Sequence, residues 1–242
     1  MSGTVAVLQG GPSAERAISL ASGEAVAGAL ERRGWRVARI DAGADLPARL
    51  TETEAERVWI ALHGPFGEDG TVQGCLATMG IPYTGTGVLG SALAMDKLRA
   101  KWVWQGAGLP TPGGLELEAT TDPVAVGQHL GWPVMVKPAR SGSSLGMARA
   151  DGPDELVEAR AGARAYDDHI LAEAWLDGVE VTVGILEGKA LPVLRLETGR
   201  GFYDYTAKYA EGAGTEYRHP TGLGEPMEAE CQRLAWAAFR AL

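Results

Sequence analysis

Hydrophobic and polar positions follow two different periods along the first hundred residues of the chain. Short, largely apolar runs at Val5–Leu8, Arg36–Ile40 and Val58–Leu62 predict strands. Longer stretches at Ala14–Arg33 and Val72–Met79 predict helices, because each is followed by a glycine that can adopt the left-handed conformation of a helix C-terminus. Strands and helices that alternate in this way predict a doubly wound α/β domain with a parallel sheet, in which ligands favour the loops after the strands' carboxyl ends.

The pattern changes after the first hundred residues. A short edge strand is predicted over Ile81–Gly85 and a helix over Val88–Gln105. The segment Leu109–Gly114 contains two prolines and two glycines, which predicts a linker. The later elements follow in irregular order and predict an α+β fold. They are helices over 122–130, 153–165 and 225–242, a strand over 170–175, and an antiparallel pair formed by 179–186 and 191–196.

The stretch Pro133–Met147 carries the strongest chemical signal in the chain. A short apolar run ends at Lys137, the loop Gly142–Gly146 contains two glycines and two serines, and a second strand-like segment follows at Met147–Ala150. Glycine lets a backbone approach phosphate closely, N–H and hydroxyl groups donate hydrogen bonds, and lysine supplies charge. In a Walker loop the lysine follows the glycines and a helix comes next. This order instead predicts a β-hairpin flap over a nucleotide.

Composition narrows the class of protein. The 242 residues are 45% apolar and 22% charged, as in an ordinary globular protein, and the net charge of −9 argues against a nucleic-acid binder. The apolar run at the N-terminus is too short for a signal peptide, and no segment has the apolar length of a membrane span. Cys75 and Cys231 are the only cysteines and make no disulfide or zinc framework. We therefore expect a cytoplasmic protein with neither nucleic acid nor membrane as a partner.

Candidate residues near the N-terminus each have two interpretations. Ser13 stands in the position of a helix N-cap, and Glu15 favours the positive start of the same helix, so capping is the simpler role for Glu15. His63 follows a predicted strand in a glycine-rich loop, where structural and functional roles are equally compatible with the pattern. Gly10-Gly11 lacks the rest of the dinucleotide-binding fingerprint, and Asp41 is the one acidic residue near a suitable place. NAD binding is therefore a distant alternative.

The lysines and serines of the second half are also ambiguous when taken alone. Lys97 lies beside Asp96 in a predicted helix, where a solvated ion pair is the ordinary role. Lys137 ends a strand that runs straight into the Gly/Ser loop, which favours phosphate binding. Ser143 and Ser144 are either turn residues or anion-binding hydroxyls. No histidine or carboxylate can be placed beside them from the sequence, so a nucleophilic serine is not supported.

Two further segments suggest a nucleotide pocket. Glu173 and Glu180 flank an apolar segment that includes Trp175. An apolar pocket with a carboxylate at its rim suits an adenosine, although two solvent-facing carboxylates are the simpler interpretation of the spacing. Residues 201–209 contain three tyrosines and a lysine, which predicts a loop that closes over a ligand.

Taken together and in this order, six segments resemble the D-alanine–D-alanine ligases of the ATP-grasp superfamily. The segments are Leu8–Arg16, Ala61–Gly70, Tyr83–Gly85, Ala94–Lys97, Val136–Ser144 and Phe202–Tyr209. The resemblance covers essentially the whole chain and implies three parts. Residues 1–95 would be an N-terminal substrate-binding domain, residues 96–180 a central ATP-grasp subdomain with the flap, and residues 181–242 the start of the C-terminal ATP-grasp subdomain.

The resemblance implies an ATP site in the second half of the chain. The residues that would hold or cover the phosphates are Lys97, Lys137, Ser143, Ser144 and Lys208. The residues that would surround the adenosine are Glu173 and Leu176 at the adenine, Trp175 through its backbone, and Glu180 at the ribose. Mg²⁺ or Mn²⁺ is implied as the second cofactor.

The resemblance also implies a substrate site. Glu15 would take the ammonium group of the first D-alanine, with His63 near the same subsite. Glu15, Ser143 and Tyr209 would form a hydrogen-bonded catalytic trio that orients this substrate, which replaces capping as the expectation for Glu15. ATP would convert the carboxylate to an acyl phosphate, and the amine of a second D-alanine would attack it to give a dipeptide for peptidoglycan synthesis. Tyr209 favours D-alanine over D-lactate as this second substrate, and a homodimer through the N-terminal domain is expected.

In this family the metal ligands lie on strands that follow the last predicted helix, and none falls within residues 1–242. We therefore expect these residues alone to have little or no ligase activity, which dipeptide synthesis by them would contradict. The alternatives are a non-catalytic nucleotide-binding remnant and another ATP-grasp carboxylate–amine ligase. The DNA beyond codon 242 distinguishes the first alternative, and a screen of amino-acid substrates distinguishes the second.

Overall fold

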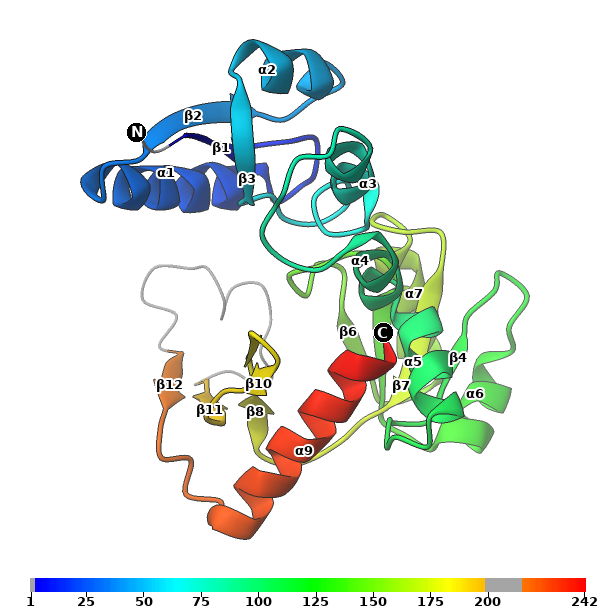
Figure 1. Ribbon diagram of the computed structural model, residues 1–242. Coiled ribbons are helices and arrows are strands. Elements are labelled where there is room, and N and C mark those ends of the chain that lie inside the picture. The colour runs from blue at the N-terminus through cyan, green and yellow to red at the C-terminus, as the bar shows by residue number, and fades with distance from the viewer. Residues whose placement is uncertain (1–2, 199–214) are drawn as a thin grey trace. The chain divides into compact units, whose positions relative to one another are not determined.

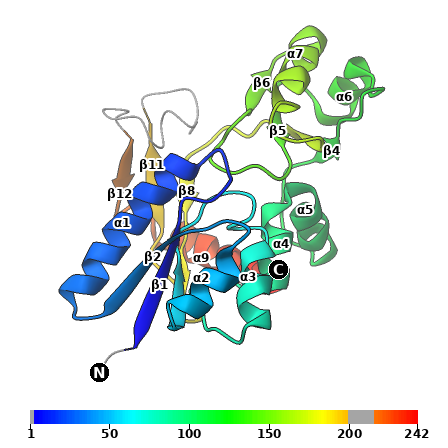
Figure 2. The ribbon, with the colours of Figure 1, turned by 90° about the horizontal axis from the view of Figure 1, so that it is seen from above.

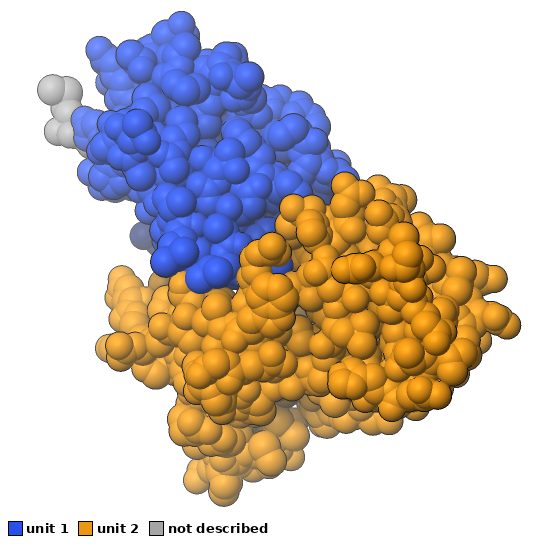
Figure 3. Space-filling view, turned by 90° about the vertical axis from the view of Figure 1, so that its right-hand side faces the viewer, with its two compact units in different colours: residues 1–96 blue, residues 97–242 orange. Residues whose placement is uncertain are grey.

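The computed structural model describes residues 3–198 and 215–242. The chain forms two compact units, residues 1–96 and residues 97–242 (Figure 3). Each unit has its own sheet and its own hydrophobic core, which is what allows a segment to fold as a unit.

Unit 1 is built on a three-stranded parallel sheet with the order β2-β1-β3. Its strands are β1 (Thr4–Gln9), β2 (Arg36–Asp41) and β3 (Ala55–Ile60). The central strand is buried on both faces, as expected of a parallel sheet: Leu8 joins one core cluster and Val7 joins another. Helix α1 (Arg16–Arg32) lies along the face with Val7 (Figure 1), and α2 (Leu46–Glu52) and α3 (Thr71–Thr78) pack on the other face. The predicted doubly wound arrangement is confirmed.

The strands at the edge of this sheet differ from the prediction. β3 begins at Ala55 and ends at Ile60, whereas the predicted strand runs from Val58 to Leu62. The predicted edge strand Ile81–Gly85 is wrong, because only Tyr83 forms an isolated parallel bridge to β3. Pro82 has no N–H to donate, so a regular ladder cannot continue through this segment.

The sequence pattern also misses one helix and joins two others. It does not predict α2, because the two buried leucines of this short helix lie a single turn apart and give too weak a periodic signal. The predicted helix Val88–Gln105 is two helices, α4 (Val88–Met95) and α5 (Lys97–Gly106). Asp96 between them has an extended backbone with φ −93° and ψ 99°, which ends α4.

The larger sheet of unit 2 is antiparallel, with the order β4-β7-β5-β6. Its strands are β4 (Gly114–Glu116), β5 (Val134–Pro138), β6 (Ala148–Ala150) and β7 (Ile170–Ala174). One face is apolar and is covered by α6 (Pro123–Leu130) and α7 (Pro153–Ala163), which lie side by side (Figure 2). Successive side chains of a strand point to opposite faces. Lys137 and Glu173 therefore lie on the face that these two helices do not cover.

The rest of unit 2 consists of a smaller sheet, a hairpin and a helix. The strands are β8 (Glu180–Thr182), β9 (Ile185–Leu186), β10 (Lys189–Ala190), β11 (Leu194–Glu197) and β12 (Glu216–Arg218). The predicted antiparallel pairing is confirmed for β8 with β11, whereas β9 folds back onto β10. The last helix, α9 (Glu225–Ala241), packs on α5, whose Trp104 donates its indole N–H to the carbonyl of Ala238 at 3.1 Å. None of the described helices is both long and apolar enough to span a membrane.

Candidate functional site

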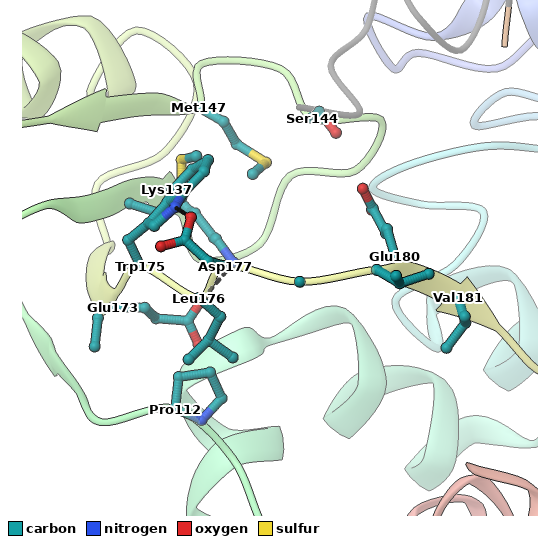
Figure 4. Close-up of a pocket in the computed structure, with 14 residues that line it drawn as sticks. Pro112, Lys137, Ser144, Met147, Glu173, Trp175, Leu176, Asp177, Glu180 and Val181 are labelled. Atoms are coloured by element: carbon teal, nitrogen blue, oxygen red, sulfur yellow. Dashed lines mark hydrogen bonds and ion pairs between the residues drawn. The ribbon is translucent and has the colours of Figure 1, made fainter. Parts of the chain in front are cut away.

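A cavity of about 660 Å³ opens in unit 2 on the face of the large sheet that carries lysine and glutamate (Figure 4). Ligand pockets usually have volumes of about 300–1,000 Å³, so this one can hold a small molecule. Its walls come from β5, from β7 and the segment after it, and from the start of β8. The lining includes Lys137, Ser144, Glu173, Trp175, Leu176 and Glu180.

Glu173 joins two lysines in a charged cluster at this cavity. Lys101 of α5 donates to Oε1 of Glu173 at 2.6 Å, and Lys137 of β5 donates to Oε2. The exposed fractions of these side chains are 6% for Lys101, 10% for Glu173 and 23% for Lys137. Burial acts to raise the pKa of Glu173, but the charge of Lys137 and the hydrogen bonds from both lysines outweigh it, so this pKa is lowered. The cluster therefore holds an ionised carboxylate and an excess of positive charge.

The segment after β7 forms an apolar wall that leads to a carboxylate. The backbone N–H of Trp175 donates to a carbonyl at 3.1 Å, and its indole N–H donates to Asp177 at 2.8 Å. The guanidinium of Arg149 lies 5.0 Å from the centre of the Trp175 ring, a cation–π contact that fixes the ring further. Leu176 is 67% exposed, and Glu180 begins β8. Such a surface can pack against a planar base and accept hydrogen bonds from sugar hydroxyls.

The predicted β-hairpin is confirmed, and its role as a flap over a nucleotide stays a prediction. β5 and β6 pair in antiparallel fashion on either side of the Gly/Ser loop. Ser143 and Ser144 have φ values of +52° and +57°, which few residues with a side chain adopt. Gly146 has a φ of +67°, and a Cβ placed there would lie 2.5 Å from Cδ2 of Tyr166. This close approach requires glycine, so the local sequence determines the shape of the loop.

Asp167 fixes the base of the flap. Its carboxylate accepts hydrogen bonds from the backbone N–H and the guanidinium of Arg140, both at 2.6 Å, and from the N–H of His169 at 3.1 Å. Burial acts to raise the pKa of Asp167, but these hydrogen bonds outweigh it and the pKa is lowered. The hydroxyl of Ser141 donates to the carbonyl of Tyr166 at 3.2 Å. The entry to the flap is therefore tied to the turn after α7.

Lys97, the first residue of α5, also holds the base of the flap. Its Nζ donates to the carbonyl oxygens of Pro138 at 3.1 Å and Ser141 at 2.6 Å, and its backbone N–H donates to Ala139 at 3.0 Å. Lys97 and Ser143 do not belong to the cavity lining. Their predicted roles at the phosphates stay predictions.

A second cluster of ionisable side chains lies in unit 1, where Glu15 at the start of α1 meets the loop after β3. Glu15 is 3% exposed, and its Oε2 lies 2.5 Å from where a Cβ on Gly64 would be. The N–H of Gly64 donates to Glu68 at 2.6 Å. Burial first, and the charge of Glu15 in addition, raise the pKa of Glu68, and the Gly64 hydrogen bond and nearby His63 offset this only in part. With two carboxylates, this cluster favours a cation such as an ammonium group.

The predicted N-cap of α1 is wrong. The N-cap position belongs to Glu15 rather than Ser13, and no side chain caps the helix there. The hydroxyl of Ser13 accepts from the N–H of Glu15 at 3.2 Å and donates to the carbonyl of His63 at 2.7 Å. Ser13 thus ties the start of α1 to the loop that contains His63.

Asp41 is the residue that allowed NAD binding as an alternative, and both of its carboxylate oxygens accept hydrogen bonds within unit 1. Both of its carboxylate oxygens accept from the guanidinium of Arg16, and one also accepts from the N–H of Gly11 at 3.2 Å. The hydrogen bond from Arg16 is the main cause that lowers the pKa of Asp41 to about 2. A carboxylate held in this way serves the loop after β1, which counts against a role at the ribose of NAD.

Some predicted residues cannot be placed. Lys208, Tyr209 and the rest of the loop 201–209 lie outside the described residues. Within residues 3–198 and 215–242, no group of three or more His, Cys, Asp or Glu side chains could hold a metal ion. The described residues therefore offer no basis for deriving a metal-dependent step.

Sequence reasoning does not find Lys101. The only available signal is its position four residues after Lys97, which places both lysines on one face of a helix. A lysine on a helix is ordinarily solvated, and only the packing of α5 against the large sheet buries this one. The cavity does collect residues predicted from distant parts of the sequence, whose individual roles stay predictions. They are Lys137, Ser144, Glu173, Trp175, Leu176 and Glu180.

A parallel α/β unit, followed by an antiparallel sheet whose flap hairpin borders a lysine-lined cavity, is the architecture of an ATP-grasp protein. Family models agree with this class. The D-ala D-ala ligase N-terminus matches residues 39–86, and the D-ala D-ala ligase C-terminus matches residues 103–242, more than half of the chain. The chain belongs to the D-alanine–D-alanine ligase family.

Individual relatives point the same way. The chain is 52% identical to the D-alanine–D-alanine ligase of Alkalilimnicola ehrlichii and 54% identical to that of Halorhodospira halophila; each match covers 98% of this chain and 76% of the relative. A solved structure of D-alanine–D-alanine ligase from Bacillus anthracis matches with a TM-score of 0.85 and 30% identity, over 99% of this chain and 79% of that one. The same enzyme complexed with ATP matches with a TM-score of 0.82 and 27% identity, over 99% and 78%.

Proposed function

We propose that this protein is an ATP-dependent ligase that joins two D-alanine molecules into D-alanyl-D-alanine for peptidoglycan precursors. The observation that carries the proposal is the cavity of unit 2, where a positive cluster and an apolar wall lie beside a flap, in a chain that belongs to the D-alanine–D-alanine ligase family. Its relatives of about 50% identity are named for this reaction.

The cavity of unit 2 is the proposed ATP site. Glu173 and Leu176 would border the adenine, Trp175 would contact it through its backbone, and Glu180 would bind the ribose. Lys137 would bind phosphate with help from the positive charge of its cluster. The remaining phosphate contacts are proposed for Lys97, Ser143, Ser144 and Lys208. In this arrangement residues 96–180 supply the central subdomain and residues 181–242 belong to the C-terminal one.

The proposed substrate domain, residues 1–95, contains the carboxylate cluster of unit 1, which is the proposed site for the first D-alanine. Glu15 would bind the ammonium of the first D-alanine, with His63 near the same subsite. The burial of Glu15 strengthens such an ion pair, because charges attract more strongly where water is excluded. Glu15, Ser143 and Tyr209 would together orient this substrate.

The reaction follows from the weakness of a carboxylate as an acyl donor. A carboxylate oxygen of the first D-alanine attacks the γ-phosphorus of ATP, and ADP leaves with the electrons of the broken P–O bond. The amine of the second D-alanine then attacks the acyl carbon, loses a proton and expels phosphate. The chain's own residues contribute position and charge, and the flap keeps water from hydrolysing the acyl phosphate. Mg²⁺ accompanies ATP in this family, and residues 3–198 and 215–242 contain no group of three or more His, Cys, Asp or Glu side chains that could hold it.

A homodimer through unit 1 and a cytoplasmic location complete the proposal. An apolar hollow of about 410 Å³ in unit 1, lined by Leu30, Trp35, Trp59 and other residues, supports the choice of this unit for association. Light scattering at several concentrations tests the dimer, and Trp59→Glu should shift it toward monomer.

Two measurements test the function. Calorimetric titration of the protein with ATP tests the cavity, and Lys137→Met should weaken binding. ADP release by the product of the complete reading frame, with D-alanine or D-lactate as the acceptor, tests the reaction. ADP release that depends on D-alanine is expected, and a preference for D-lactate would overturn the assignment. Binding of ATP without ADP release would favour a non-catalytic nucleotide-binding protein.

A further inference from the structure

The charged cluster contains a residue to which the proposed function assigns no role, Lys101. It is 5% exposed, and its Nζ lies 2.9 Å from Oγ1 of Thr111, 2.6 Å from the carbonyl oxygen of Pro112 and 2.6 Å from Oε1 of Glu173. A lysine ammonium has three N–H donors. These three acceptors therefore satisfy it completely and fix it in one position.

The backbone around Lys101 leaves room for its side chain. A Cβ placed on Gly114 would lie 3.1 Å from Cε of Lys101 and 3.1 Å from the carbonyl oxygen of Ala172. A side chain at position 114 would press on the lysine from one side and on β7 from the other. The glycine at the start of β4 thus allows Lys101 to reach Glu173.

Lys101 connects two walls of the cavity. Pro112 and Glu173 both line it, and Lys101 binds both. The other oxygen of Glu173 binds Lys137. Lys101 therefore controls the orientation of the carboxylate that positions the lysine proposed for phosphate.

Charge gives Lys101 a second effect. Lys137 and Glu173 alone would form a neutral pair, whereas Lys101 leaves the cluster with one positive charge in excess. Burying an additional cation is unfavourable unless it has partners, and the three acceptors of Lys101 let the cluster keep this charge. Asp177 and Glu180 also line the cavity, so the excess positive charge is local to the cluster, where it attracts an anion.

We propose that Lys101 is a positioning residue for ATP. Lys101 orients Glu173 and Pro112, and its positive charge lets the cluster attract the triphosphate while Lys137 stays paired with Glu173. The inference rests on the proposed function, because the ligand is the ATP assigned to this cavity.

Calorimetric titration of ATP into the protein at low and high ionic strength tests the proposal. Lys101→Met should weaken ATP binding at low ionic strength by at least about tenfold and should make the affinity less dependent on salt, because salt screens charges. The matched control is Lys189→Met on β10, an exposed lysine, which should stay within about twofold of the wild type. Wild-type affinity and salt dependence in Lys101→Met would overturn the inference.

Two further variants separate this role from a purely structural one. Lys101→Arg keeps the charge, and Lys101→Met combined with Glu173→Gln restores the excess charge, so both should regain the salt dependence that Lys101→Met loses. A purely structural lysine would lower the melting temperature in Lys101→Met and leave the salt dependence unchanged in every variant. That result would contradict the proposal.

The outcomes also distinguish this inference from the proposed function. A wild-type protein that does not bind ATP refutes the ATP site itself, whereas normal binding by Lys101→Met refutes only the role of Lys101. If Lys101→Met does not fold, Gly114→Ala takes its place, because it displaces Lys101 without removing its charge. We expect ATP affinity several-fold below that of the wild type with the salt dependence retained, and an unchanged affinity would count against the inference.

Discussion

Each unit contains a cluster of ionisable side chains around a glutamate, and the neighbours of the two glutamates have opposite charge. In unit 2, Glu173 lies between Lys101 and Lys137, and its pKa is lowered. In unit 1, Glu68 lies near Glu15, and its pKa is raised. Burial acts in the same direction on both glutamates, so the neighbours decide the outcome. The cluster with excess positive charge suits a phosphate, and the one with two carboxylates suits an ammonium group.

The clusters also differ in what holds them. In unit 2 the partners of Glu173 are side chains from two other elements of the fold, α5 and β5. In unit 1 the carboxylate of Glu68 is held by a backbone N–H four residues away, that of Gly64. A buried charge whose partner is removed has no replacement, whereas a backbone donor survives most substitutions. Single substitutions should therefore cost more in the cluster of unit 2.

The largest expected effect is the loss of Glu173. Glu173→Gln leaves the buried Lys101 and the half-buried Lys137 without their carboxylate, which should lower the free energy of unfolding by about 3–5 kcal/mol. Urea denaturation at neutral pH measures it. Glu230→Gln, on the exposed pair with Arg233, is the matched control and should cost less than about 1 kcal/mol. Equal costs for the two variants would remove the distinction drawn for unit 2.

Next in size is the loss of charge at Glu15. If its carboxylate binds the ammonium of D-alanine, Glu15→Gln should lower kcat/KM for D-alanine by about 100-fold, since a hydrogen bond to a charged group contributes about 1.5–3 kcal/mol. The KM for ATP should not change. ADP release by the product of the complete reading frame gives both values. Glu24→Gln, on the exposed side of the same helix, is the control, and an equal loss there would argue against a substrate role for Glu15.

A smaller effect is expected from Gly64, which stands between the two carboxylates of unit 1. Its φ is +71°, and the Cβ introduced by Gly64→Ala would lie 2.5 Å from Oε2 of Glu15. We expect a loss of about 1–3 kcal/mol in the free energy of unfolding. Gly74→Ala in α3 is the control, because no atom lies within 4 Å of the added Cβ. That change should be neutral or stabilising, and a similar loss at both positions would show that crowding at Glu15 is not the cause.

The smallest effect concerns pH. A lowered pKa means that the contribution of Glu173 is present above its ordinary value of 4.5 and is lost as the pH falls through the folded-state pKa. The pKa of Glu68 is raised, so its contribution to stability is present at low pH and is lost as the pH rises through the folded-state pKa. Relative to the wild type, Glu68→Gln should therefore become more stable as the pH rises from about 4 to about 7. Denaturation curves across this range test the sign, and a relative stability that falls with pH would reverse the comparison.

Much of the fold could be predicted because it is encoded locally. The alternation of strands and helices in the first hundred residues and the Gly/Ser loop between two short strands each depend on neighbouring residues, and the structure contains both. The break at Asp96 and the short helix α2 could not be predicted. Both depend on which surfaces the rest of the unit presents, and a propensity argument has no access to that.

The sequence predicts where the site residues lie along the chain but not which of them contact one another. The sequence predicts Lys137 at the end of one strand and Glu173 near the end of another, with solvated carboxylates as the simpler interpretation. Only the register that pairs Met135 with Glu173 shows that both face one cavity. The burial of Lys101 depends on contacts with Pro112 and Glu173, which lie 11 and 72 residues away in the chain. No local sequence pattern predicts a contact between residues so far apart in the chain.

The tethered base of the flap should protect its backbone from exchange with solvent. The N–H of Ala139 donates to His169 at 2.8 Å and that of Arg140 to Asp167 at 2.6 Å, so these amide protons exchange with solvent only when the sheet itself opens. At the tip, the backbone N–H groups of Leu145 and Met147 donate to the carbonyl oxygens of Gly142 and Ser144 in the same loop. Hydrogen exchange should therefore be slow at the backbone amides of Ala139 and Arg140.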